Sequence, residues 1–256
     1  MENTTTVTFF KDGFFGYGDN NDFCFGSIWH TLPIILMIIT IVFIYKYRKQ
    51  IKNYKYETSV RYIFAFVMLF VEMSFFWRLS YVGTQGAADN MLGYLPLQIC
   101  QWGLIISVFT LISKNKKLFS INFFITLLFA SVALAYPLVI KNAGPTYYRY
   151  YQFWLEHTLP IISVFYLMFV HDIKLEYKGI YRTFAFIIPF AIVCMIVNYN
   201  IPNANYLYLK LDVPFLPDGQ IIRAIILSFV VFIIFHLMYF IYYVIDKSAM
   251  DKKNVK

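Results

Sequence analysis

The sequence predicts an all-α fold, a polytopic membrane helix bundle with seven transmembrane helices. Three observations support this prediction. Of the 256 residues, 60% are hydrophobic and only 14% are charged, whereas about 25% of the residues of a soluble domain are charged. Apolar runs recur along the chain at about the 20-residue length that crosses the hydrocarbon core of a bilayer. The basic residues gather in short clusters between these runs.

Each predicted helix is an apolar run bounded by basic or polar residues. In chain order the runs are Ile28–Tyr45, Arg61–Leu79, Leu92–Ile112, Leu118–Pro137, Gln152–Val170, Tyr181–Tyr199 and Ile221–Ile245. The first run ends at a basic cluster that begins at Lys46, and Lys114–Lys117 separates the third run from the fourth. A loop rich in proline and asparagine, Asn200–Gln220, follows the sixth run and includes Asn205. We expect this loop to be either a lid over a site or a surface connection.

The charges between the runs predict the orientation of the chain. One set of alternate loops contains Lys46, Arg48, Lys49, Lys52, Lys55, Lys114, Lys116, Lys117, Lys174, Lys178 and the C-terminal lysines. Because basic loops stay in the cytoplasm, we expect the N-terminus outside and the C-terminus in the cytoplasm. The whole chain, 1–256, is then one transmembrane domain, with an extracytoplasmic segment 1–27, a bundle 28–245 and a cytoplasmic tail 246–256. The net charge of +8 follows from this topology, so we expect no nucleic-acid partner.

The cysteines and His236 offer little support for a metal site or a cysteine nucleophile. The three cysteines, Cys24, Cys100 and Cys194, form neither a CxxC motif nor zinc-ligand spacing with histidine, so we expect no metal and no cofactor. Most buried cysteines are inert packing residues, and we favour that interpretation of Cys100 over a nucleophile. For His236 we favour an interhelical hydrogen bond over membership of a site.

Several polar side chains lie inside the predicted helices. A charged group at the centre of a membrane helix costs about 2.5–3.5 kcal/mol on insertion scales, so such groups are expected to face the interior of the bundle. With a rise of 1.5 Å per residue, Glu72 lies about 10–13 Å below the outer end of its helix, and Gln98 and His157 lie at about 10 Å. Arg78 lies nearer the surface, where we expect it to pair or to hold a lipid phosphate. Three helices thus place polar groups in one layer of the outer half of the bilayer.

Helical phase refines this layer. Tyr94, Gln98 and Gln101 are spaced by four and three residues and share one helical face. Cys100 is two residues from Gln98, so it is expected to point away and not to line the same cavity. Pro160 removes the backbone hydrogen bond to the Glu156 carbonyl and favours a bend there.

Two interpretations of the adjacent Glu156 and His157 remain open. In the structural one, Glu156 pairs with Arg78 or Arg149, and His157 bonds to a neighbouring helix. In the functional one, His157 is a general acid or base, oriented by Glu72 or Glu156.

Three short runs, "GYLPLQICQW" (Gly93–Trp102), "FWLEHTLPI" and "NANYLYL", resemble motifs of the YwaF-like bacterial integral membrane family. That family is similar to eukaryotic transmembrane acyltransferases of ether phospholipids, and more distantly to androgen-induced membrane hydrolases of fatty-acid esters. The resemblance implies lipid acyl chemistry in a six-helix core, with one extra N-terminal helix here, in a bacterial plasma membrane.

The same resemblance bears on individual residues. His157 stands where these families place a histidine, whereas Gln98 stands where the bacterial pattern usually has one. The eukaryotic branch has cysteine and then histidine at the positions of Leu97 and Gln98, so Cys100 does not correspond to that cysteine.

We therefore expect a multi-pass cell-membrane protein whose partner is a membrane lipid. The leading hypothesis is acyl transfer or acyl hydrolysis with His157, Glu72 and Gln98 as catalytic residues. Arg78, Tyr94, Gln101, Glu156 and Asn205 are the expected substrate-binding residues. The alternatives are a small-solute or ion transporter and a non-catalytic lipid-binding or assembly protein, the latter favoured by glutamine rather than histidine at position 98.

Overall fold

The structure, a computed structural model, describes residues 13–16, 23–82, 95–137, 144–202, 204–210 and 217–254. Over these ranges the chain is helical apart from turns and short connections, and contains no strand. The helices in chain order are α1 (Ile28–Lys52), α2 (Glu57–Val82), α3 (Ile99–Ser113), α4 (Lys116–Ile125), the π-helix η2 (Thr126–Ala130), α5 (Ser131–Ala135), α6 (Tyr148–Val170), α7 (Gly179–Asn200), the 3₁₀ helix η4 (Tyr206–Tyr208) and α8 (Gln220–Asn254).

Within the described ranges, six helices are long and apolar enough to cross a membrane, with α4, η2 and α5 together forming one of them. The third predicted span differs. We expected a helix from Leu92, but α3 begins at Ile99 and has 15 residues. At 1.5 Å per residue it is about 22 Å long, shorter than the roughly 30 Å hydrocarbon core. The residues just before it, on either side of Pro96, are not helical.

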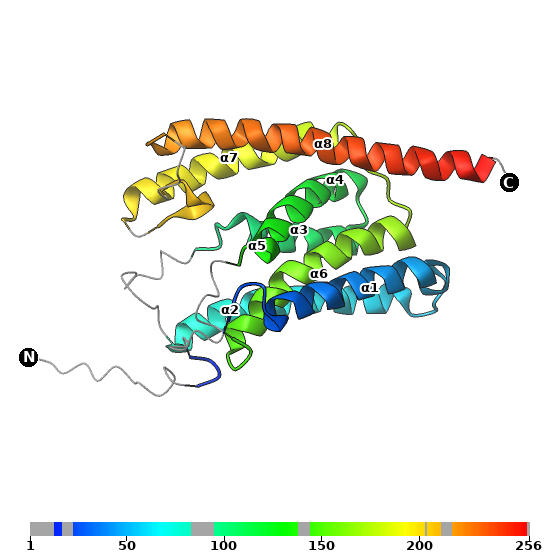
Figure 1. Ribbon diagram of the computed structural model, residues 1–256, viewed down its shortest axis with the longest axis horizontal. Helices are drawn as coiled ribbons and strands as arrows, with labels where there is room; N and C mark the ends of the chain where they lie inside the picture. The colour runs from blue at the N-terminus through cyan, green and yellow to red at the C-terminus, as the bar shows by residue number, and fades with distance from the viewer. Residues whose placement is uncertain are drawn as a thin grey trace, which may run out of the picture.

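The helices form three layers (Figure 1). In the lower layer α1 packs on α6 and α2 packs beside α6; α3, α4 and α5 lie in the middle, and α7 and α8 form the upper layer. The core lies between the layers, where Leu104, Phe124 and Leu167 are fully buried. Because α6 lies between the other helices, its polar residues Glu156 and His157 are buried.

One end of the bundle gathers the basic loops. Lys52, at the end of α1, forms an ion pair of 2.8 Å with Asp172, just after α6. Arg61 of α2 donates to the carbonyl oxygen of Leu111 near the end of α3, and forms a buried ion pair of 3.0 Å with Glu57. The positive-inside rule assigns this end to the cytoplasm, and that orientation stays a prediction.

A polar contact joins the fourth span to α3 at the start of the π-helix. Ser107 of α3 and Thr126 of η2 both donate to the Asn122 side-chain oxygen, at 2.7 and 2.8 Å. Gly103 permits this close approach, since a Cβ atom there would lie 3.3 Å from Thr126 Oγ1. π-helical turns inside α-helices are frequent at functional sites, and this one leads directly into the site described next.

Candidate functional site

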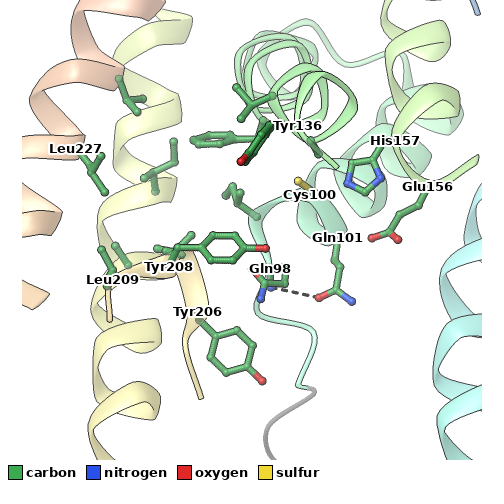
Figure 2. A pocket seen from close by; sticks show the side chains of 18 of the residues that line it. Gln98, Cys100, Gln101, Tyr136, Glu156, His157, Tyr206, Tyr208, Leu209 and Leu227 are labelled. Carbon is green, nitrogen blue, oxygen red and sulfur yellow. Dashed lines mark hydrogen bonds between the residues drawn. The ribbon is translucent and has the colours of Figure 1, made fainter. Parts of the chain in front are cut away.

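A cavity of about 510 Å³ lies at the end of the bundle opposite the basic loops, where α3 and α6 begin. Its wall contains residues of α2, α3, α5, α6, α7 and α8, together with η2 and η4. Most of these residues are apolar or aromatic, including Phe129 of the π-helix and Val132 of α5. A volume between about 300 and 1,000 Å³ with few polar groups is typical of small-molecule sites. The lining side chains converge on this space in Figure 2.

His157 is the histidine on the cavity wall. Its Nδ1 atom lies 2.7 Å from the carbonyl oxygen of Phe153, one turn earlier in α6. Because a carbonyl oxygen only accepts, Nδ1 carries the proton of the neutral ring and Nε2 carries the lone pair. Nε2 has no hydrogen-bond partner in the part of the chain that the structure describes. The Phe153 ring packs against the imidazole with centroids 4.4 Å apart, which fixes its orientation.

Glu156 belongs to a polar stripe on the same helix. Gln152 donates to Glu156 Oε2 at 2.9 Å, and Arg149 pairs with the same oxygen at 3.4 Å. The three side chains are spaced by three and four residues, which places them on one face of α6. The Arg149 guanidinium also lies over the Phe75 ring of α2, 4.7 Å from its centroid. The predicted pairing of Glu156 with Arg149 is therefore confirmed, and it leaves the Glu–Arg pair formally neutral.

Glu72 reaches the site through another residue. It does not line the cavity, but its Oε1 accepts a hydrogen bond of 3.0 Å from Gln101, which does. The Gln101 side-chain oxygen in turn accepts from the Gln98 backbone nitrogen at 3.2 Å. Gln101 thus joins α2 to the first turn of α3. Neither Glu72 nor Glu156 hydrogen-bonds to His157, so the expectation that a carboxylate orients the imidazole is wrong: the Phe153 carbonyl does so.

The expectation that Cys100 and Gln98 face different ways is also wrong. Both line the cavity, as Figure 2 shows. The expectation assumed a continuous helix with 100° per residue. Gln98 is instead the N-cap of α3, with extended backbone angles of φ −82° and ψ 135°. The helical phase begins only at Ile99, and both side chains reach the same space.

Two other predicted binding residues, Arg78 and Asn205, do not line the cavity. Arg78 donates to the carbonyl oxygens of Phe15 at 2.8 Å and Gly16 at 2.6 Å, and so fastens the N-terminal turn to α2. The Asn205 side-chain oxygen accepts from the Lys210 backbone nitrogen at 2.8 Å, a bond within its own loop. Tyr94 lies outside the described residues.

His236 and Cys194, which were also considered from the sequence, do not line the cavity. The Nδ1 atom of His236, in α8, lies 2.8 Å from the Phe232 carbonyl oxygen of its own helix, so the expected bond to another helix is not observed. Cys194 is buried in α7, with its sulfur 3.6 Å from the Leu97 carbonyl oxygen.

The sequence alone did not single out the loop residues of the cavity wall. Tyr206, Leu207, Tyr208 and Leu209 all line the cavity. Leu207 and Tyr208 have positive φ angles of 57° and 54°, a conformation that costs side chains of this kind about 1–3 kcal/mol each. The signal available was the run "NANYLYL", in which tyrosine alternates with leucine inside a polar loop.

The fold and the cavity together define a helical multi-pass membrane protein with a ligand-sized site inside the bundle. The model of the TMEM164 family matches residues 25–242. The chain therefore belongs to this family of transmembrane proteins. No curated protein matches the chain, and no solved structure does.

Proposed function

We propose that this protein is a lipid-modifying membrane enzyme of acyl-transfer or acyl-hydrolase type that acts in the outer half of the bilayer. One observation carries the proposal. The His157 Nε2 lone pair lies on the wall of an apolar cavity, while Nδ1 is held by a backbone carbonyl. An imidazole fixed in this tautomer is suited to general base catalysis. Intramembrane ionisable groups are functional candidates by default.

The shape and composition of the cavity support a lipid substrate. Val132 of α5, Tyr136 just after α5 and Leu227 of α8 line the cavity, yet are 57%, 62% and 36% exposed. In a membrane-spanning bundle, exposed apolar side chains face lipid, so this part of the wall is continuous with the lipid-facing surface. An acyl chain is then able to enter sideways between α5 and α8, with its ester directed toward α6.

The proposed reaction needs no enzymic nucleophile. An acceptor hydroxyl, or water in the hydrolytic version, attacks the ester carbonyl carbon while His157 Nε2 takes its proton. The tetrahedral intermediate collapses, the bond to the leaving alkoxide breaks, and His157 returns the proton to that oxygen. Glu72 acts here as a positioning residue, because it holds Gln101 at the cavity wall.

The test uses the purified full chain in nanodiscs that contain a phospholipid with an isotope-labelled acyl chain. Mass spectrometry follows labelled free acid, lysolipid and transacylated product. We expect these products with the wild-type chain and their loss with His157→Gln. The matched control is His236→Gln, which removes a histidine in the same local geometry away from the cavity. Product levels that are equal in wild-type and empty nanodiscs would sink the proposal.

One observation favours a second candidate, a non-catalytic lipid-binding protein. A backbone carbonyl rather than a carboxylate lies behind His157 Nδ1, and a carbonyl stabilises an imidazolium less than a carboxylate does. Labelled lipid that copurifies with the chain and stays chemically unchanged would favour this candidate. Solute flux through liposomes that depends on His157 would favour a transporter over both.

A further inference from the structure

The loop between α7 and α8 contains a short segment, 204–210, that we call the roof segment. Four consecutive residues of it, from Tyr206 to Leu209, line the cavity on the side opposite α6. Ala204, Tyr206 and Leu209 are at most 2% exposed. The roof segment is therefore a built part of the site, although it belongs to a loop.

Three polar side chains hold the roof segment against the helices that flank it. Asn198 of α7 accepts from the Tyr206 backbone nitrogen at 2.7 Å and donates to the Tyr206 carbonyl oxygen at 3.0 Å. Arg223 of α8 donates to the Leu209 carbonyl oxygen at 3.4 Å. Lys210 donates to the Ile201 carbonyl oxygen at 3.2 Å. These bonds fix the backbone on both sides of the two residues with positive φ.

This backbone conformation places the Tyr208 side chain at the cavity. Left-handed angles at two successive residues that are neither glycine nor asparagine are rare, and such strain clusters at active sites and ligand clamps. Figure 2 shows the Tyr208 ring extending into the cavity, with its hydroxyl directed toward the side that carries Gln98 and Cys100.

The Tyr208 hydroxyl is available to a ligand. It has no hydrogen-bond partner within the described residues, unlike the Tyr150 hydroxyl, which donates to the Trp29 carbonyl oxygen at 2.7 Å. Although Tyr208 is 45% exposed, its partial burial raises the pKa of the phenol; the nearby Cys100 and Glu156 raise it further, and Arg149 opposes them. The phenol therefore keeps its proton at neutral pH and is a hydrogen-bond donor at the cavity.

We propose that Tyr208 is a catalytic residue whose hydroxyl donates a hydrogen bond to the carbonyl oxygen of a lipid ester bound between it and His157. This inference rests on the proposed acyl chemistry. As the acceptor oxygen bonds to the carbonyl carbon, the π electron pair moves to the carbonyl oxygen, and the acceptor's proton goes to His157 Nε2. Tyr208 stabilises the resulting oxyanion and keeps its own proton. When the carbon–oxygen bond to the leaving alcohol breaks, that alcohol takes the proton from His157.

The test compares two probes with the same alkyl chain. One is a phosphonate monoester, which presents a tetrahedral anionic group like the oxyanion. The other is an ether, which lacks a carbonyl oxygen. Binding to the full chain in nanodiscs is measured for wild type, Tyr208→Phe and Tyr199→Phe. Tyr199 is the control because its ring is 84% exposed at the end of α7 and does not line the cavity.

We expect Tyr208→Phe to weaken phosphonate binding by at least about tenfold, to leave ether binding unchanged, and to lower kcat by roughly 10²–10³-fold with little change in KM. Tyr199→Phe is expected to match wild type in each measurement. Equal weakening of both probes would mean that Tyr208 only shapes the cavity, and unchanged phosphonate binding would also overturn the inference. If the wild-type chain binds neither probe, the proposed function itself fails, whatever Tyr208 does.

Discussion

His157 of α6 and His236 of α8 have the same local geometry in different surroundings. In each case Nδ1 lies close to the carbonyl oxygen of a phenylalanine four residues earlier, at 2.7 Å for His157 and 2.8 Å for His236. That phenylalanine ring also packs on the imidazole, with centroids 4.4 and 4.3 Å apart. Only His157 lines the cavity. The Phe-x-x-x-His arrangement therefore orients a histidine, and the position on the bundle decides whether it meets a ligand.

This pair gives the sharpest test of the proposed base. We expect His157→Gln to lower the rate of acyl release by roughly 10²–10⁴-fold, the usual contribution of a positioned base. His236→Gln is expected to leave the rate within about twofold, because His236 does not line the cavity. It is a matched control, since both substitutions remove an equivalent bond to a backbone carbonyl. Initial rates with a labelled phospholipid provide the measurement. Similar rate losses in the two variants would show that His157 contributes only to packing.

The Glu72–Gln101 hydrogen bond is expected to hold α2 against the start of α3. Gln101→Leu removes the donor to the Glu72 carboxyl group, which is 3% exposed, and this costs about 1–3 kcal/mol. The unfolding temperature in detergent is expected to fall accordingly. Adding Glu72→Leu removes the carboxyl group left without its hydrogen-bond donor, so the double variant is expected to be more stable than Gln101→Leu alone. A double variant less stable than either single variant would contradict this account.

The helical spans are the part of the fold that hydrophobicity determines most directly. The runs around Pro160 and around His236 became long helices, because apolar side chains in a bilayer favour the only backbone arrangement that satisfies its own hydrogen bonds. The start of α3 was not predictable in this way. Leu95 and Leu97 are as apolar as the helix that follows, and the extended backbone at Gln98 is visible only in three dimensions.

The sequence predicted some residues of the candidate site and missed others. The cost of placing charged and polar side chains in lipid correctly singled out Glu156, His157 and Gln101 as residues that face the interior. That argument does not apply to Tyr208, because tyrosine is common in loops and its proposed role depends on the positive φ angles of Leu207 and Tyr208 itself. The bond from His157 to the Phe153 carbonyl was likewise missed, since a backbone acceptor leaves no trace in the residue pattern.

Gly179 is expected to be essential for packing α7 onto α4. A Cβ atom at this position would lie 2.4 Å from Ser120 Cβ, and both residues are buried. Gly179→Ala is therefore expected to destabilise the bundle by about 1–3 kcal/mol through overpacking. Adding Ser120→Gly relieves the clash and is expected to recover part of the loss. Gly13→Ala is the control, since nothing lies within 4 Å of its added Cβ; the measurement is again thermal unfolding in detergent.

The surroundings of His171 predict how the stability of the folded chain depends on pH. His171 directly follows the membrane-spanning helix α6, and its Nε2 lies 2.8 Å from Glu57 Oε1. Burial lowers the pKa of His171 below its ordinary 6.5, helped by Lys114 and Arg61 and opposed by the hydrogen bond and charge of Glu57. As pH falls below 6.5, the unfolded chain takes up a proton that the folded chain resists, so the folded state loses stability.

Lowering the pH from about 7.5 to about 5.5 is therefore expected to lower the unfolding temperature of wild type more than that of His171→Gln, which cannot take up this proton. Equal decreases in the two proteins would show that His171 does not contribute to the acid sensitivity.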